Sequence, residues 1–417
     1  MRSAEGAPGT VPCLAAGCRP GFEAEAADDL RRAAAAAGLQ PGVAAHPVPG
    51  LVVVPCAAPA ATAVRAALDR ARPVFARNPF VGVGPVALDA RDAAGRPDRI
   101  APLLAAIEAL PAAVHGTAQR APYVEHPDTN EGKALSPLAR GLGARLDAAL
   151  AAAGRLRADA PRRLHVFLAD GTTAYVGTSA AAATPWPLGI PRIRVARGAP
   201  SRSAAKLAEA FVVFLGDAVA DVLRPGMRAV DLGAAPGGWT WLLAQKGLRV
   251  TAVDNGALRG PAAHDPLVTH LRADGLAYRP RRPVDWLVCD IVERPARIAE
   301  VVAGWIADGD ARYAIFNLKL PMKKRIEEVA RCAGIVEDRL ARAGVAHDFA
   351  LRQLYHDREE VTGCLVRHEG APRGRHGAAV TRPPARARAS RTPAGSPPAA
   401  RGAGAGTTSR RQRRRAR

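Results

Sequence analysis

The stretch Val230–Trp239, VDLGAAPGGW, decides the fold of the C-terminal half of this 417-residue chain. The stretch begins at the end of an apolar run that contains an aspartate. A turn with three glycines follows, Gly233, Gly237 and Gly238. Glycine lets the backbone approach a ligand without a Cβ in the way, and the helix expected after the turn points its first N–H groups at that ligand. The stretch therefore predicts a strand, a turn and a helix that together form a ligand site.

Predicted strands and helices alternate around this stretch, over residues 200–368. Helices are expected over Pro295–Ala307 and Lys323–Arg342, and the segments RQLYH (Arg352–His356) and EVTGCLVRH (Glu360–His368) are expected to pair antiparallel. This alternation is typical of an α/β fold with a Rossmann-like, doubly wound and mostly parallel sheet. The parallel strands would be RAVDLG, RVTAVD, VTHLRAD, VDWLVCD and YAIFNLK.

Each of these five strands ends in an ionisable residue, in chain order Asp231, Asp254, Asp274, Asp290 and Lys319. In doubly wound sheets, ligands bind beyond the carboxyl ends of the strands. One or two charged residues at strand ends would be ordinary solvent-exposed residues. A charged residue at all five strand ends predicts a functional site along this rim of the sheet. Lys319 follows the apolar run YAIFNL, so its ammonium group must reach water or take part in chemistry.

The rim also indicates the class of cofactor. Asp254 follows Asp231 by 23 residues, at the end of the second strand, where an acid can bind both hydroxyls of a ribose. The loop GAAPGG lacks the second glycine of the dinucleotide pattern GxGxxG, where a pyrophosphate would approach, and the acids around it favour a cation. S-adenosylmethionine has an adenosine, a positive sulfonium and no phosphate. It therefore fits better than NAD, and a nicotinamide-dependent dehydrogenase is the disfavoured rival.

Motifs along residues 13–362 carry a resemblance to a known family. Residues 200–368 resemble the FtsJ-like RNA ribose 2′-O-methyltransferases, which have the class I methyltransferase fold. Within that group, the chain is similar to the bacterial 23S ribosomal RNA cytidine 2′-O-methyltransferases of the RlmM type. The motifs are CRPGFE, DTNE, GIPR, APSRSAAKLAEAF, VDLGAAPGGWTW, VDNG, VCDIVERPAR, IFNLKLPMKKR and RQLYHDREEVT.

The resemblance implies methyl transfer from S-adenosylmethionine to a cytidine ribose in 23S ribosomal RNA, before ribosome assembly and by a monomer. It implies a catalytic set of Lys206, Asp290, Lys319 and Glu360, with Lys319 as the proton acceptor. The implied cofactor-binding residues are Ser203, Ala235, Pro236, Gly237, Gly238, Asp254, Asp274 and Asp290. The residues alone leave Glu359 open beside Glu360, because two neighbouring acids at the start of a strand lie on opposite faces.

Residues 1–95 predict a small α/β sandwich. Strands are expected in VPCLAAGCRPGFE and GLVVVPC with a helix after each, the second over Ala57–Ala71. Further on, a polar loop EHPDTNEGK precedes a helix, and the strands RLHVFLAD and TTAYVGTS meet at the turn dipeptide Asp170-Gly171. The resemblance implies that residues 1–95 form a ferredoxin-like domain and residues 96–195 a THUMP-type RNA-binding domain, both α+β.

The charge of the chain favours a polyanionic partner, nucleic acid first. The formal net charge is +21, and residues 369–417, with 13 arginines and one acid, contribute +12 of it. This segment has almost no large apolar residue with which to order itself, which predicts a disordered basic tail. A coding bias toward arginine, alanine, glycine and proline is the alternative explanation of the tail's composition.

Several classes of protein are excluded by composition. The six cysteines show no zinc-type spacing, which favours a reduced, cytoplasmic protein without a metal. No apolar run reaches the roughly 18 residues of a membrane span. Two functional rivals stay open, namely the same chemistry on another RNA such as tRNA and a noncatalytic RNA-binding protein. Lys323 and Lys324 are equally consistent with phosphate contacts and with plain surface.

Overall fold

The computed structural model describes residues 10–56, 66–68, 72–110, 118–194 and 198–368. The predicted helix over residues 57–71 lies mostly outside these ranges, and the predicted disordered tail, residues 369–417, lies wholly outside them. Among the described residues, no helix is long and apolar enough to cross a membrane, and no group of His, Cys, Asp and Glu is placed to hold a metal ion.

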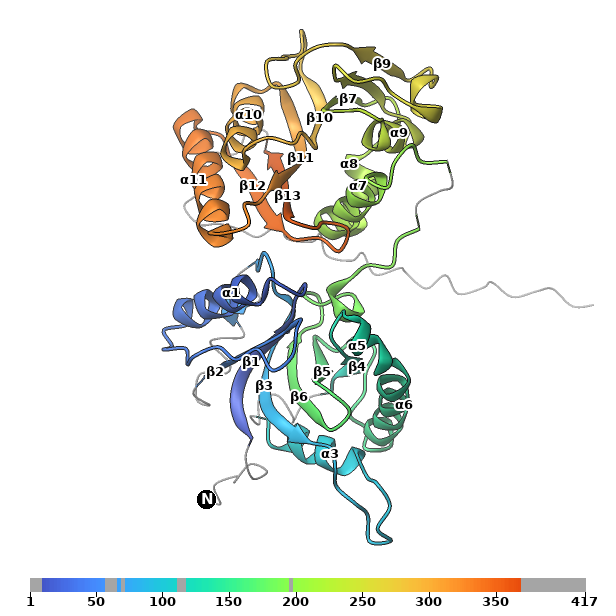
Figure 1. Cartoon of the computed structure of the whole chain (residues 1–417), viewed down its shortest axis with the longest axis vertical. Helices are drawn as coiled ribbons and strands as arrows, with labels where there is room; N and C mark the ends of the chain where they lie inside the picture. Colours follow the sequence, from blue (N-terminus) through green and yellow to red (C-terminus); the bar gives the residue numbers. More distant parts are fainter. Residues whose placement is uncertain (1–9, 57–65, 69–71, 111–117, 195–197, 369–417) are drawn as a thin grey trace, which may run out of the picture. The chain divides into compact units, whose positions relative to one another are not determined.

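The C-terminal half forms a seven-stranded sheet in the order β12-β13-β11-β10-β7-β8-β9 (Figure 1). The parallel strands are β7 Arg228–Leu232, β8 Arg249–Val253, β9 Val268–Leu271, β10 Val284–Cys289 and β11 Ala311–Lys319. An antiparallel pair, β12 His347–Arg352 and β13 Glu360–Arg367, closes the sheet on the β11 side. The chain order reverses between β7 and β10, so their carboxyl ends form the switch point where such sheets bind ligands. The predicted Rossmann-like, mostly parallel sheet is confirmed.

Helices cover both faces of this sheet because its central strands are apolar on both. In β10, Leu287 belongs to the same buried cluster as residues of α10 and α11, whereas Trp286 packs with residues of α7 and α9. Figure 1 shows these two pairs of helices on opposite sides of the strands. The helices are α7 Ala204–Ala210, α8 Val219–Val222, α9 Gly238–Gln245, α10 Pro295–Asp308 and α11 Arg325–Ala343.

The predicted strand Arg352–His356 is wrong. Strand β12 ends where that segment begins, and residues 353–356 form an irregular turn. Three amides of this turn, those of Leu354, Tyr355 and His356, donate to side chains instead of to a neighbouring strand. The N–H groups of Tyr355 and His356 donate to the buried carboxylate of Glu209, at 2.8 and 2.9 Å. Helix α7, which carries Glu209, therefore fixes the turn that leads into β13.

The N-terminal half forms a six-stranded sheet in the order β2-β1-β3-β6-β5-β4 (Figure 1). Its strands are β1 Val11–Gly17, β2 Leu51–Pro55, β3 Arg77–Ala87, β4 Arg120–Glu125, β5 Arg162–Leu168 and β6 Thr173–Ala180. Its helices are α1 Glu23–Ala36, α3 Ile100–Glu108, α5 Asn130–Ala134 and α6 Ser136–Ala152. The predicted β5–β6 hairpin is confirmed. Strands from both predicted N-terminal regions share this sheet through the β3–β6 pairing, and a domain boundary at residue 95 stays a prediction.

Strands β3 and β4 are not predicted by the sequence patterns. In β3, RNPFVGVGPVA, glycine and proline lower the strand propensity. Here the glycines serve close packing, because Gly82 lies opposite Gly177 and a Cβ on Gly82 would overlap the carbonyl oxygen of Val176. The predicted polar loop EHPDTNEGK contains the short helix α5, whose first turn is capped by Thr129 Oγ1 accepting from Gly132 N–H at 2.8 Å.

Candidate active site

Four elements bring the predicted catalytic residues together at the carboxyl edge of the C-terminal sheet. Lys206 lies on α7, Asp290 directly follows β10, Lys319 ends β11 and Glu360 begins β13. The antiparallel register of β11 and β13 places Lys319 opposite Glu360. The four residues are far apart in sequence. The strand order makes Asp290, Lys319 and Glu360 neighbours, and α7 brings Lys206 to them.

The two lysines and two carboxylates form two joined ion pairs. Lys319 Nζ pairs with Asp290 Oδ1 and Lys206 Nζ pairs with Glu360 Oε1, while Lys319 Nζ also lies 4.0 Å from Glu360 Oε1. The side chains are only 10–23% exposed, so solvent weakens these attractions less than it does at an open surface. Glu360 thus touches both ammonium groups.

The charges around Lys206 keep it protonated. Burial alone would lower the pKa of this ammonium, but the carboxylates of Asp290 and Glu360 outweigh burial, and the pKa of Lys206 is raised. Lys206 therefore contributes a fixed positive charge to the site at neutral pH.

The structure separates the two adjacent acids that the residues alone left open. Glu360 is buried and contacts both lysines, whereas Glu359 is exposed and its Oε2 lies 2.7 Å from Arg325 Nη2. The alternation of side chains along a strand explains the difference, since Glu359 and Glu360 point to opposite sides. Only Glu360 is placed to act with the lysines.

A pocket of about 260 Å³ lies beside these residues, at the switch point between β7 and β10. It is lined by Ser201, Ser203, Asp231, Gly233, Ala234, Ala235, Pro236, Trp239 and Asp290. The lining holds carboxyl and hydroxyl groups and no lysine or arginine, which suits a cationic ligand without a phosphate. Asp290 belongs both to this pocket and to the ion pairs.

Comparison with known proteins assigns the chain to a family. Residues 199–336 match the model of FtsJ-like methyltransferases, and residues 98–180 match the N-terminal model of ribosomal RNA large subunit methyltransferase M. The ribosomal RNA large subunit methyltransferase M of Methylococcus capsulatus is 50% identical over 84% of this chain and 96% of its own length. That of Thauera aminoaromatica is 45% identical over 84% of this chain and 94% of its own.

The chain belongs to the ribosomal RNA large subunit methyltransferase M family. It is thus an S-adenosylmethionine-dependent enzyme that methylates large-subunit ribosomal RNA. Among solved structures, fibrillarin of Aeropyrum pernix with bound S-adenosyl-L-methionine aligns over 48% of this chain and 81% of its own, with a TM-score of 0.29 and 16% identity.

The remaining predicted cofactor residues lie around the same pocket. Asp254 accepts hydrogen bonds from the N–H groups of Ala235, at 2.9 Å, and Gly256, at 2.7 Å, so it braces the glycine turn. Gly237 has φ 111°, which a residue with a side chain rarely adopts. Asp274 is exposed and accepts from the N–H of Leu276 at 2.9 Å, in the loop after β9.

Ser203 and Gly238 are joined by close packing of α7 against α9. Ser203 precedes α7 but makes no side-chain capping bond, and its hydroxyl instead lies 2.5 Å from that of Ser201. A Cβ on Gly238 would overlap both hydroxyl oxygens. The backbone oxygen of Ser203 accepts from the indole of Trp239 at 2.9 Å. Ser203 therefore lies in the pocket wall.

Sequence reasoning did not identify three buried polar residues behind the ion pairs, Asn317, Thr362 and Asp357. Asn317 Nδ2 donates to Asp290 Oδ1 at 2.9 Å, and Thr362 lies opposite Asn317 in the β11–β13 register. A signal was present in the sequence, because Asn317 interrupts an apolar strand two residues before Lys319, on the same face.

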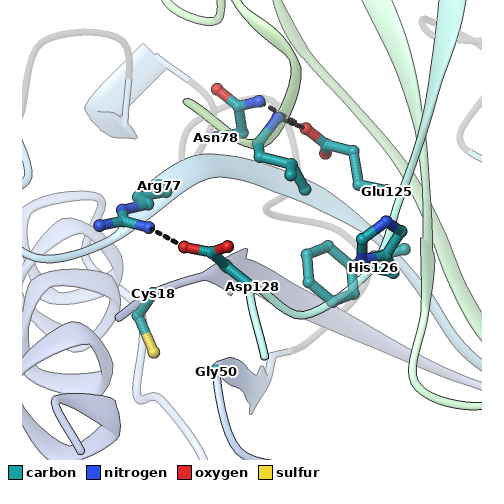
Figure 2. A pocket seen from close by; sticks show the side chains of 10 residues that line it. Cys18, Gly50, Arg77, Asn78, Glu125, His126 and Asp128 are labelled. Carbon is teal, nitrogen blue, oxygen red and sulfur yellow. Dashed lines mark hydrogen bonds and ion pairs between the residues drawn. The ribbon is translucent and has the colours of Figure 1, made fainter. Parts of the chain in front are cut away.

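A second, smaller pocket lies in the N-terminal sheet domain (Figure 2). Arg77 is buried there, with Nη1 3.6 Å from Asp128 Oδ2, and the neighbouring Asn78 donates to Glu125 at 2.7 Å. Burial lowers the pKa of the Arg77 guanidinium, and Asp128 opposes that effect. Acidic side chains balance the charge of Arg77 in this pocket. The charge of the pocket alone therefore does not identify a ligand.

Proposed function

We propose that this enzyme methylates the ribose 2′-OH of a cytidine in 23S ribosomal RNA, with Lys319 as the proton acceptor. The observation that carries the proposal is the sharing of Asp290 between the pocket and the ion pair with Lys319. A methyl donor in the pocket and a ribose hydroxyl beside Lys319 would meet at this one carboxylate. Holding two reactants in line is worth several kcal/mol, so positioning is the larger part of the catalysis.

The cofactor would be held by the residues that the family resemblance implied. These are Ser203, Ala235, Pro236, Gly237, Gly238, Asp254, Asp274 and Asp290. The carboxylate of Asp254 retains lone pairs beyond its two backbone hydrogen bonds and can accept from ribose hydroxyls. When bound, S-adenosylmethionine supplies a methyl group made electrophilic by its sulfonium.

The two lysines would have different tasks. Lys206 stays protonated and is tied to Glu360, so it serves as a fixed charge that orients the site. Lys319 would react as the neutral amine, after its ammonium proton has passed to solvent. Its Nζ would then take the 2′-OH proton, and Asp290 would stabilise the ammonium that forms again through the contact that it already makes. Glu360, within reach of both lysines, would hold their separation.

The RNA would approach over the two loops that follow Asp290 and Lys319. These rim loops, residues 291–294 and 320–324, expose Val292 by 86% and Met322 by 88%. They also expose basic side chains, including Lys323 and Lys324. Apolar groups next to cations suit an unpaired nucleotide, whose base covers the apolar side chain while its phosphates meet the lysines.

The N-terminal half would supply the remaining RNA affinity. We assign residues 1–95 to a ferredoxin-like domain and residues 96–195 to a THUMP-type RNA-binding domain, in line with the family resemblance. The enzyme would work in the cytoplasm as a monomer, on ribosomal RNA that is not yet assembled into subunits. Its net charge supports binding to a polyanion.

Mapping of ribose methylation on total RNA, from cells with and without the enzyme, tests the proposal. We expect one 2′-O-methylcytidine in 23S ribosomal RNA to depend on the enzyme. If cells without the enzyme instead lack a ribose methyl group in tRNA, tRNA is the substrate. An unchanged methylation map would contradict catalysis of this reaction.

A further inference from the structure

A chain of buried polar side chains runs from the catalytic carboxylate of Asp290 into the core. Asn317 Nδ2 donates to Asp290 Oδ1 at 2.9 Å, and Thr362 Oγ1 lies 2.8 Å from Asn317 Oδ1. Thr362 Oγ1 also lies 3.0 Å from Asp357 Oδ2 and 3.2 Å from Asp357 Oδ1. Asn317, Thr362 and Asp357 are each fully buried, so bulk water does not reach them.

The number of protons on these three side chains decides whether all of their contacts can be hydrogen bonds. Thr362 has one hydroxyl proton, but the carbonyl oxygen of Asn317 and the carboxyl group of Asp357 both lie within its reach. Turning the Asn317 amide around does not help, because its oxygen would then face the carboxylate oxygen of Asp290. One further proton is needed to satisfy every contact.

With a proton on Asp357, every contact in this row of side chains has one donor and one acceptor. Asp357 Oδ1–H then donates to Thr362 Oγ1, whose own hydroxyl donates to Asn317 Oδ1, and the Asn317 amide donates to Asp290. The second oxygen, Asp357 Oδ2, accepts from the N–H of Leu354 at 2.9 Å, as a carbonyl oxygen can.

We propose that Asp357 is held as a neutral carboxylic acid, and that Asp357, Thr362 and Asn317 are positioning residues that fix Asp290 and, through it, Lys319. The proposal rests on the function proposed above, in which Lys319 accepts the ribose proton. None of the three residues lines the pocket or needs to meet a substrate, and they act by orienting the carboxylate that holds the lysine.

The charged groups around Asp357 come from four elements. Lys206 on α7 and Glu360 at the start of β13 face it, and Asp290 with Lys319 lies at the far end of the chain. Burial raises the pKa of Asp357 to about 8, Glu360 acts in the same direction and Lys206 opposes both. Above that pH, the ionised Asp357 carboxylate would accept the hydrogen bond of the Thr362 hydroxyl. Asn317 Oδ1 would then have no donor.

Infrared difference spectroscopy tests the protonation state directly. The wild-type spectrum minus that of Asp357→Asn at pH 7 should show the carbonyl stretch of a protonated carboxylic acid. The band should disappear as pH rises through about 8. Absence of the band at pH 7 would overturn the proposal, and this measurement does not depend on catalysis.

Kinetics test the positioning role. Asp357→Asn keeps a neutral donor toward Thr362, so it should retain activity within about threefold at pH 7. It should also lose the alkaline decline of kcat that we expect for the wild type. Thr362→Val should lower kcat about tenfold, as expected for one buried hydrogen bond, with unchanged S-adenosylmethionine affinity. Thr362→Ser, which keeps the hydroxyl, should restore the rate.

Two results would contradict the positioning role. One is an alkaline decline that Asp357→Asn shares with the wild type. The other is equal activity of Thr362→Val and Thr362→Ser. Lys319→Ala, measured alongside, keeps the two hypotheses separate, because its full activity would refute the proton acceptor without changing the infrared result.

Discussion

At the scale of single residues, Gly238 is closely packed beside the pocket wall. A Cβ at this position would overlap Ser201 Oγ and Ser203 Oγ. Gly238→Ala should therefore weaken S-adenosylmethionine binding about tenfold or more, the equivalent of 1–3 kcal/mol of overpacking. Calorimetric titration measures this. Gly334→Ala on α11, where a Cβ meets nothing within 4 Å, is the matched control and should bind normally.

Asp231 gives a prediction about pH and stability. This carboxyl is buried beside Thr240, which donates to it at 2.6 Å, and desolvation raises its pKa to about 7. An unfolded aspartate has a pKa of about 3.9. The folded protein therefore binds the extra proton between these values, and its stability falls as pH rises from about 4 to 7.

The side chain of Asp231→Asn cannot bind this proton. The Tm of the wild type minus the Tm of the variant should therefore decrease from pH 5 to pH 7. Thermal unfolding of both proteins across that range measures the difference. Buried Asp357 contributes equally to both and cancels. A Tm difference that stays constant with pH would show that Asp231 is ionised throughout.

At the residue scale, sequence is most informative where parallel strands end in charged residues. Asp290 and Lys319 meet because the carboxyl ends of parallel strands share one edge, and that rule needs only the strand assignment. Glu360 begins the antiparallel strand β13 and meets them through its pairing with Lys319. Asn317 and Thr362 were missed because their role depends on the register of β11 against β13, which the sequence does not reveal. The choice of Glu360 over Glu359 depended on the same register.

At the scale of elements, the rim loops after β10 and β11 are the proposed path of the RNA. Met322→Ser should raise KM for RNA about fivefold, or about 1 kcal/mol of lost apolar burial, with kcat little changed. Steady-state kinetics on a 23S fragment measure this. Val43→Ser is the matched control, because Val43 is 85% exposed in the N-terminal half. Equal kinetics of the two variants would remove Met322 from the RNA surface.

The elements that sequence predicted wrongly share a physical cause. Strand β3 is rich in glycine because Gly82 must approach β6 closely, and that need contradicts local strand propensity. The segment 353–356 resembles a strand, yet the amides of Tyr355 and His356 bond the carboxylate of Glu209 on α7. In both places a contact with a distant part of the chain outweighs the local pattern.

At the scale of the whole molecule, the basic tail is expected to add nonspecific RNA affinity. Residues 369–417 contribute +12 of the net charge of +21. Each phosphate contact adds about 0.7 to 0.9 to the slope of log K against log salt concentration. Removing the tail should therefore flatten the salt dependence of RNA binding without lowering kcat. An identical slope for the shortened and full chains would mean that the tail does not contact RNA.

The central claim is that Lys319 accepts the proton from the ribose hydroxyl. The decisive measurement is methyl transfer to 23S ribosomal RNA by Lys319→Ala, quantified as 2′-O-methylcytidine by mass spectrometry, with S-adenosylmethionine binding measured on the same sample. We predict that the variant binds the cofactor as the wild type does and forms no detectable methylated product. Methylation at a rate near that of the wild type would contradict the mechanism.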